Sequence, residues 1–149
     1  MTKIISVVSS MPMAGKTAFC MNLGAQLAAQ NFRICLLSNT NELSRLDNAF
    51  GLHPKKDLKA LTTAGSDLNE IVLKDFFGID IIPGSYDDER LMDTGNGIKK
   101  LAEIELEFDA YDFLIIDNSA GVDAQVIASS LAATETLLLI NPTIEVITD

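Results

Sequence analysis

Three residues with distinct chemical roles, Gly15, Lys16 and Thr17, stand in succession near the start of the chain. They lie between a continuous apolar run at residues 4–8 and a stretch, residues 17–30, whose apolar residues recur with helical spacing. Backbone N–H groups at the start of a helix lack partners within the helix, and the helix dipole adds partial positive charge there. Lys16 would add a full positive charge, and the Thr17 hydroxyl would reach a Mg²⁺ that bridges phosphate groups. The segment therefore predicts a phosphate-binding loop.

This loop matches the pattern G-x-x-x-x-G-K-[ST] only in part. Ser10 replaces the first glycine, and Pro12 has no N–H group to donate. The alternative is an ordinary strand-to-helix turn in which Gly15 only permits close packing. The position between an apolar strand and a helix favours the phosphate loop. We expect the phosphate groups to be bound by Met13, Ala14, Gly15, Lys16, Thr17 and Ala18.

A carboxylate, Asp117, ends the apolar run at residues 113–116. In a parallel sheet, ligands bind outside the carboxyl ends of the strands, so Asp117 would emerge beside the loop. There it could hold a water molecule on Mg²⁺ or the Thr17 hydroxyl. The alternative is that Asp117 caps a helix that starts near Val122. Together with the loop, the metal role is favoured, and we predict a metal site formed by Thr17 and Asp117.

The remaining pattern indicates the elements that position these residues. Five apolar runs without polar alternation predict strands covered on both faces, at residues 4–8, 33–37, 79–82, 113–116 and 136–140. Helices are predicted at residues 17–30, with Phe19, Leu23 and Leu27 four residues apart on one face, and at 57–62, 68–72, 96–110 and 122–133. The predicted fold is α/β, a three-layer, doubly wound and mainly parallel sheet.

Composition narrows the class of protein. A chain of 149 residues with 48% hydrophobic and 21% charged residues is one folded domain rather than a disordered chain. A net charge of −10 without a basic stripe argues against nucleic acid as a direct ligand. No apolar run approaches the roughly 20 residues of a membrane-spanning helix. Cys20 and Cys35 form no metal or disulfide motif and indicate buried thiols in a reducing, cytoplasmic setting.

The last residues of the chain have the pattern of a helix start but are too few to form a full helix. Asn141, Pro142 and Thr143 are typical of a helix start, but only residues 144–149 follow. We therefore expect residues 1–149 to be the N-terminal part of a longer nucleotide-binding domain that is truncated at its C-terminus.

Collinear segments resemble the MinD/ParA family of P-loop ATPases, especially its FlhG-type branch of flagellar-number regulators. Residues 3–17 resemble the family's first strand and deviant Walker A loop, and residues 111–121 resemble its Walker A′ strand. Further similar segments are the second strand and switch at 36–52, the stretches 53–61 and 78–84, and the turn at 141–149. The resemblance implies ATP or ADP with Mg²⁺ as cofactors, a nucleotide-dependent homodimer, and protein partners of a positioning system. Within these residues we find no membrane-binding signal.

The chain departs from the family at positions that matter for hydrolysis. Met11 stands in place of the signature lysine, which reaches the partner's nucleotide, and Thr40 in place of the aspartate that positions the attacking water. A cationic finger is worth about 10³–10⁵ in rate and a water-orienting carboxylate about 10²–10⁴. We therefore predict weak or absent hydrolysis and assign no catalytic residue. Lys16, Thr17 and Asp117 do match the family pattern.

Three functions follow from these patterns. The first is an ATP-binding switch that positions a flagellum or a division site. The second is a scaffold of the same fold that does not hydrolyse ATP and acts through protein contacts. The third is a P-loop metabolic enzyme of the dethiobiotin-synthetase type, for which no substrate-binding residues are found.

Overall fold

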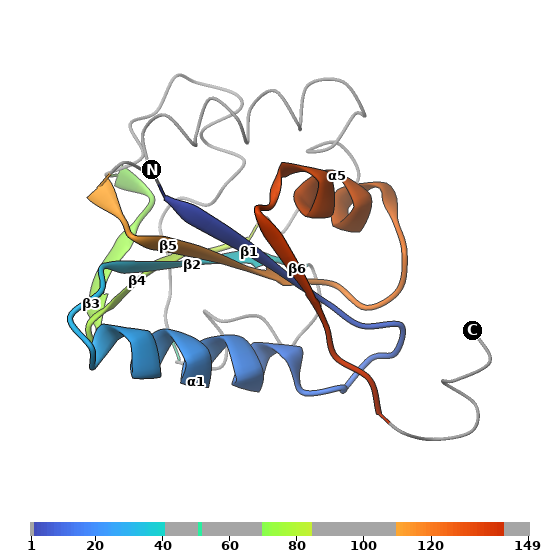
Figure 1. The fold of residues 1–149 in the computed structure, drawn as a ribbon, viewed down its shortest axis with the longest axis horizontal. Coiled ribbons are helices and arrows are strands. Elements are labelled where there is room, and N and C mark those ends of the chain that lie inside the picture. Colours follow the sequence, from blue (N-terminus) through green and yellow to red (C-terminus); the bar gives the residue numbers. More distant parts are fainter. Residues whose placement is uncertain (1, 41–50, 52–69, 85–109, 142–149) are drawn as a thin grey trace.

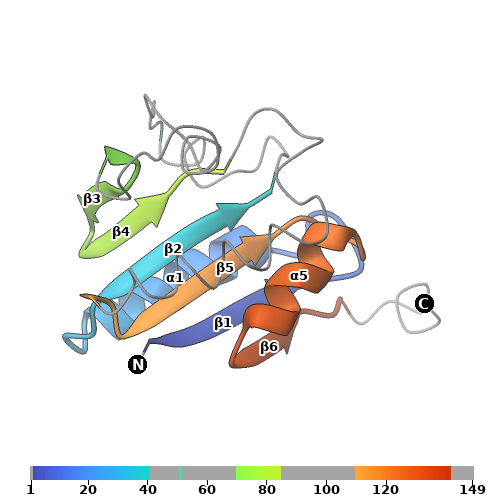
Figure 2. The ribbon, with the colours of Figure 1, turned by 90° about the horizontal axis from the view of Figure 1, so that it is seen from above.

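The computed structural model describes residues 2–40, 51, 70–84 and 110–141, which form one six-stranded sheet with a helix on each face (Figure 1). The elements are β1 (Lys3–Val8), α1 (Lys16–Ala28), β2 (Ile34–Asn39), β3 (Leu73–Phe76), β4 (Ile79–Ile82), β5 (Phe113–Asn118), α5 (Ala124–Ala132) and β6 (Glu135–Leu138). The strand order is β3-β4-β2-β5-β1-β6 (Figure 2), and all pairs are parallel except β3 with β4.

Two apolar cores lie on opposite faces of this sheet. The core beneath α1 contains alternate strand residues such as Val7, Leu36 and Ile115, and the core on the α5 face contains the residues between them, such as Leu37 and Ile116. Successive strand side chains point to opposite faces, so strands buried on both sides read as continuous apolar runs. The three-layer, doubly wound, mainly parallel α/β fold is therefore confirmed.

The five predicted strands and two of the predicted helices are present; β4 has its predicted bounds, and the ends of the others are shifted. β2 and β5 continue two residues beyond their apolar runs, to Asn39 and Asn118, and α1 ends at Ala28. The helix predicted at residues 57–62 lies outside the described residues, as do residues 96–109 of the helix predicted at 96–110. The first two residues of the helix predicted at 68–72, and residues 142–149 of the C-terminal helix start, also lie outside them. Ile71 and Val72 are buried and lead directly into β3.

The apolar residues that share one face of the first helix lie beside its buried centre, and Leu23 and Leu27 pack against the core there. Cys20 and Gly24 are the buried residues at its centre, whereas Leu23 is half-buried and Phe19 is 36% exposed. The cause is close packing, because a Cβ on Gly24 would lie 3.1 Å from Cδ1 of Ile79. The small residues thus let the helix backbone approach the sheet, and the larger side chains flank the contact.

The sequence pattern does not predict β3, which is short and carries two exposed charged residues. A tight connection through Phe77 and Gly78 joins it to β4, and Asp75 and Phe77 both adopt positive φ angles, 56° and 53°. A cluster of polar side chains supports this hairpin. Lys74 Nζ donates to Oδ2 of Asp80 and to the hydroxyl of Tyr111, both at 2.9 Å, and Tyr111 donates to Oδ2 of Asp80 at 2.6 Å.

This cluster predicts a pH dependence of stability. Burial alone raises the pKa of Asp80, but hydrogen bonds from Tyr111, a backbone N–H group and Lys74 outweigh it and lower the pKa below 3.8. Because the pKa is lower in the folded state, this stabilisation is complete above pH 3.8 and is lost as the pH falls through the folded-state pKa. We expect the free energy of unfolding in urea to fall more steeply with acid for the unaltered chain than for Asp80→Asn. Parallel curves would contradict this assignment.

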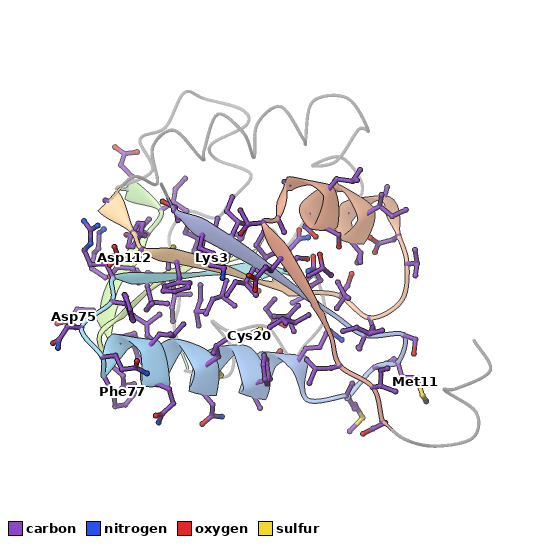
Figure 3. The ribbon with its side chains drawn as sticks, in the orientation of Figure 1. Lys3, Met11, Cys20, Asp75, Phe77 and Asp112 are labelled. Carbon is purple, nitrogen blue, oxygen red and sulfur yellow. The ribbon has the colours of Figure 1, made fainter. Side chains whose placement is uncertain are left out.

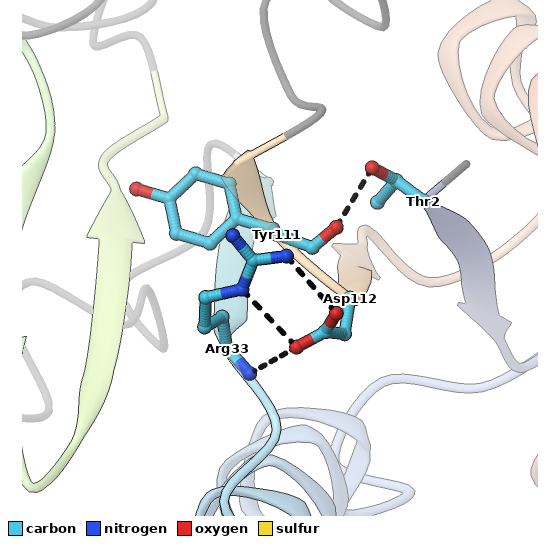
Figure 4. A network of polar contacts seen from close by, with 4 residues as sticks. All are labelled: Thr2, Arg33, Tyr111 and Asp112. Atoms are coloured by element: carbon cyan, nitrogen blue, oxygen red, sulfur yellow. Dashed lines mark hydrogen bonds and ion pairs between the residues drawn. The ribbon is translucent and has the colours of Figure 1, made fainter.

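A second polar group fixes the amino-terminal edge of the sheet (Figure 4). The backbone N–H and the guanidinium group of Arg33 donate to the carboxylate of Asp112, at 2.8–3.3 Å. Thr2 donates to the carbonyl of Tyr111 at 2.9 Å. These contacts tie the starts of β2 and β1 to the start of β5, so the three strands that carry the candidate site at their other ends keep one register.

Candidate functional site

The predicted site residues lie at the carboxyl ends of the three central strands. β5 lies between β2 and β1, so the ends of these strands meet where the loop between β1 and α1 begins. Figure 3 shows Met11 in this loop, at the end of the molecule opposite Asp75, Phe77 and Asp112. The fold therefore brings together segments around residues 9–17, 38–40 and 117–121 that are far apart in the sequence.

The loop enters α1 through a left-handed glycine. Gly15 is the N-cap residue, with φ 84° and ψ 17°, and no side chain caps this helix within the described residues. A Cβ on Gly15 would meet nothing within 4 Å, so the backbone angle, rather than space, requires the glycine. Because Gly15 has no side chain, the N-cap residue itself offers no acceptor to the first turn of α1, which suits the binding of an anion there.

Met13 adopts a left-handed conformation as well, with φ 58°, and its side chain is 97% exposed. A left-handed backbone costs a non-glycine residue about 1–2 kcal/mol. We expect Met13→Gly to raise the free energy of unfolding by about 0.5–1 kcal/mol, because relief of strain exceeds the added entropy of the unfolded chain. Met13→Ala, which keeps a Cβ, is the control and should bring little change in urea denaturation. Equal stabilities for the glycine and alanine variants would show that the backbone here carries no strain.

The Lys16 side chain is buried, with 7% exposure, although lysine is almost never fully buried without a partner. Its Nζ donates to Oγ of Ser9 at 2.7 Å, and Oγ of Ser9 donates to the carbonyl of Met11 at 2.8 Å. The N–H of Gly121 donates to the Ser9 carbonyl at 2.9 Å, which ties the segment after β5 to the loop. The ammonium group is therefore held inside the loop. Ser9 was not among the predicted site residues.

Thr17 and Asp117, the predicted metal residues, are in direct contact. Oγ1 of Thr17 donates to Oδ2 of Asp117 at 2.7 Å, and Asp117 is 1% exposed. The alternative, that Asp117 caps the following helix, is wrong. The cap of α5 is Asp123, whose side chain accepts from the N–H of Val126 at 2.8 Å.

Cys20 lies on α1 beneath this pair, facing the sheet (Figure 3). Burial raises the pKa of its thiol far above the ordinary value of 9.0, and the negative charge of Asp117 raises it further. Cys35 is buried too, and burial likewise raises its pKa. Both cysteines are unpaired and buried, as predicted. Because the thiolate is the reactive form, the raised pKa and the burial favour a structural role for both cysteines.

A network of amide and hydroxyl groups supports the site from the α5 face. The side-chain amide of Asn118 donates to Oγ of Ser6 and to the carbonyl of Val7, both at 3.0 Å. Its Oδ1 accepts from Nδ2 of Asn39 at 2.7 Å and from Oγ of Ser129 at 2.6 Å. One side chain therefore connects β2, β5, β1 and α5. Its role was not predicted from the sequence, although Asn118 directly follows Asp117.

The residues present fit a hydrated divalent cation. Thr17 and Asp117 offer hydroxyl and carboxylate oxygens, which are the ligands that Mg²⁺ prefers. Ser38 is the register partner of Asp117 and adds a fully buried hydroxyl that has no hydrogen-bond partner within the described part of the chain. Met11, Ser38 and Thr40 carry no charge, so these positions supply neither a cationic finger nor a carboxylate.

Comparison with known proteins adds relatives but no family model, since none matches the chain. The chain is 24% identical over 150 residues to the flagellum site-determining protein YlxH of Helicobacter pylori, covering 99% of this chain and 51% of that protein. It is 26% identical over 153 residues to the septum site-determining protein MinD of Synechocystis, covering 100% and 57%. The structure of MinD from Pyrococcus horikoshii, complexed with Mg-ADP, superposes with a TM-score of 0.82 at 27% identity, covering 99% and 61%.

The chain thus spans about half the length of the curated relatives it matches. Within the described residues, no helix combines the length and the apolar character that crossing a bilayer requires. The likeness extends over the whole sheet and includes the loop and strand ends that carry the candidate site.

Proposed function

We propose that this chain binds ATP and ADP with Mg²⁺ and acts as a switch in a positioning system. The proposal starts from its homologues, which are MinD and FlhG (YlxH) proteins, and from its fold, which is that of the MinD/ParA P-loop ATPases. The observation that carries the proposal is the contact between Thr17 and Asp117 beside the uncapped start of α1. An anion-binding backbone and a pair of cation ligands at one point suit a nucleotide with its metal ion. The structure positioned would be a flagellum or a division site.

The roles of the residues follow from their contacts. The N–H groups from Met13 to Ala18 would bind phosphate oxygens, and Lys16 would exchange its bond to Ser9 for a bond to phosphate. A charge-assisted hydrogen bond is about twice as strong as a neutral one, which favours that exchange. Thr17 and Asp117 would hold the Mg²⁺, which neutralises phosphate charge when bound.

Weak or absent hydrolysis belongs to the same proposal. Met11 is partly exposed on the loop and has no charge to place on a transferring phosphate. Thr40 is buried at the end of β2 and cannot accept a proton at neutral pH. ATP binding and a nucleotide-dependent association of two copies would then persist without efficient turnover.

Calorimetric titration of the full chain with Mg-ATP and with Mg-ADP tests nucleotide binding. We expect micromolar binding that weakens when EDTA removes Mg²⁺, and no binding of adenosine, which lacks phosphate groups. Gel filtration with and without ATP then tests association. Absence of heat with both nucleotides, together with an unchanged melting temperature, would overturn the proposal.

The scaffold of the same fold is the second candidate because apolar side chains are exposed in the loop and in the segment after β5, which Gly121 joins to the loop. Met13 is 97% exposed, and Val122, in the segment after β5, is 82% exposed. Exposed apolar groups gathered at one edge are typical of protein contacts. A melting temperature that responds to neither nucleotide would favour this scaffold over the switch.

A further inference from the structure

One polar group at the end of β2 is unexplained by the fold. Ser38 has 0% exposure, and within the residues that the structure describes its Oγ reaches no hydrogen-bond partner. Leaving a buried hydroxyl unsatisfied costs about as much as a whole hydrogen bond contributes to stability. Such a group is uncommon in a native protein, and one beside a binding site points to a ligand.

The direction of the Ser38 side chain follows from the alternation along the strands. Leu36 belongs to the core beneath α1, so Ser38, two residues later, faces α1 as well. The same reasoning applies to Ile115 and Asp117 on β5. Because Ser38 and Asp117 are register partners, their side chains are neighbours on the face where Thr17 binds Asp117.

The backbone around Ser38 is held firmly in place. A Cβ on Gly84 would lie 2.6 Å from the Ser38 carbonyl oxygen and 3.0 Å from that of Thr40. Glycine is therefore needed at this position, where the backbone after β4 packs directly against the end of β2. Asn39 is fixed by its bond to Asn118 on the other face. The end of β2 therefore presents the Ser38 hydroxyl to the Thr17 and Asp117 pair at a fixed position.

We propose that the Ser38 hydroxyl binds a water molecule in the hydration shell of the divalent cation held by Thr17 and Asp117, as a neutral third oxygen of the site. This inference rests on the proposed function. Mg²⁺ dehydrates reluctantly and keeps several waters, so a buried hydroxyl beside its ligands has a water to bind. Asp117 is the carboxylate of the described site. Most of the negative charge around a bound cation would therefore come from the phosphate groups of the nucleotide. Cation binding is therefore coupled to nucleotide binding.

A pair of serine variants tests this role without an activity assay. Ser6 is also fully buried on a central strand, but on the opposite face and with hydrogen-bond partners. Without ligand, Ser38→Ala should leave the melting temperature unchanged or raise it, because it removes an unsatisfied group, whereas Ser6→Ala should lower it by about 2–4 °C. In titrations of ADP at graded Mg²⁺ concentrations, Ser38→Ala should need about 5–10-fold more Mg²⁺. Ser6→Ala should need the same amount as the unaltered chain.

A third variant, Ser38→Asp, replaces the neutral hydroxyl by a negative charge. Ser38→Asp places a second carboxylate beside Asp117, where two buried negative charges repel each other. We expect its melting temperature to fall without ligand and to be restored by Mg²⁺ alone, without nucleotide. The unaltered chain should show no such response to Mg²⁺ alone.

The outcomes separate this inference from the proposed function. If the unaltered chain binds Mg-ADP and Ser38→Ala has an unchanged Mg²⁺ requirement, the water-binding role is wrong and the proposed function stands. A large loss of ligand-free stability in Ser38→Ala would also overturn it, because the hydroxyl would then have a structural partner. If the unaltered chain fails to bind Mg-ADP, both fall together.

Discussion

Replacing Lys16 by alanine should lower the affinity for Mg-ADP by about 10²–10³-fold. The ammonium group would make charge-assisted bonds to phosphate, each worth about 1.5–3 kcal/mol, and two such bonds account for this loss. The ligand-free protein should keep its free energy of unfolding. Lys16 is a buried cation whose Nζ donates to the neutral hydroxyl of Ser9, so the cost of burying its charge offsets that hydrogen bond. Calorimetric titration gives the affinity, and thermal melting without ligand gives the stability.

Lys3→Ala is the matched control for this measurement. Lys3 lies at the opposite end of β1 from the loop, is half exposed, and pairs with Glu135 at 2.6 Å. An exposed ion pair contributes at most about 1 kcal/mol, and it is remote from phosphate. The control should bind Mg-ADP like the unaltered chain. Equal affinities for the Lys16 variant and the control would remove the phosphate-binding role of the loop.

Most of the fold could be predicted from the sequence, because β1, β2, β4 and β5 are largely buried on both faces and stand out as apolar runs. β6 also stands out as an apolar run, but it is an edge strand with mostly exposed residues, so the prediction that it is covered on both faces is wrong. β3 could not be predicted, since it is a short edge strand with charged residues, and its hairpin depends on a distant partner, Tyr111. The buried centre of α1, at Cys20 and Gly24, could not be predicted from the spacing either. Helical spacing counts apolar side chains, whereas the contact with the sheet uses the absence of a side chain at Gly24.

Some residues of the candidate site could be predicted from the sequence, and others could not. Lys16 and Thr17 belong to a local motif, and Asp117 ends an apolar strand, so residue type and spacing were enough to propose them. Ser9, Ser38 and Asn118 have no such signal, because their contacts come from strand order and register rather than from neighbours in the sequence. A buried serine or asparagine can be interpreted only once its surroundings are known.

Replacing Asn118 by alanine should destabilise the fold by about 3–5 kcal/mol, a large part of the 5–15 kcal/mol typical of a domain. The variant removes the hydrogen bonds of the Asn118 side chain to Ser6, Val7, Asn39 and Ser129. Within the described residues it leaves the side-chain amide of Asn39 without an acceptor. Each buried polar group left unsatisfied costs about 1–3 kcal/mol, and the apolar face of alanine offers no replacement. Urea denaturation followed by circular dichroism measures the loss.

Asn22→Ala is the control that shows how much stability is lost when an asparagine outside this network is replaced. Asn22 is exposed on α1 and donates to the carbonyl of Ala18 at 2.7 Å, a bond that water can replace. Asn22→Ala should change the free energy of unfolding by at most about 0.5 kcal/mol. If both variants lose the same stability, the Asn118 network does not hold the strands together. If only Asn118→Ala unfolds readily, the strand ends that carry Ser38 and Asp117 depend on one amide on the far face of the sheet.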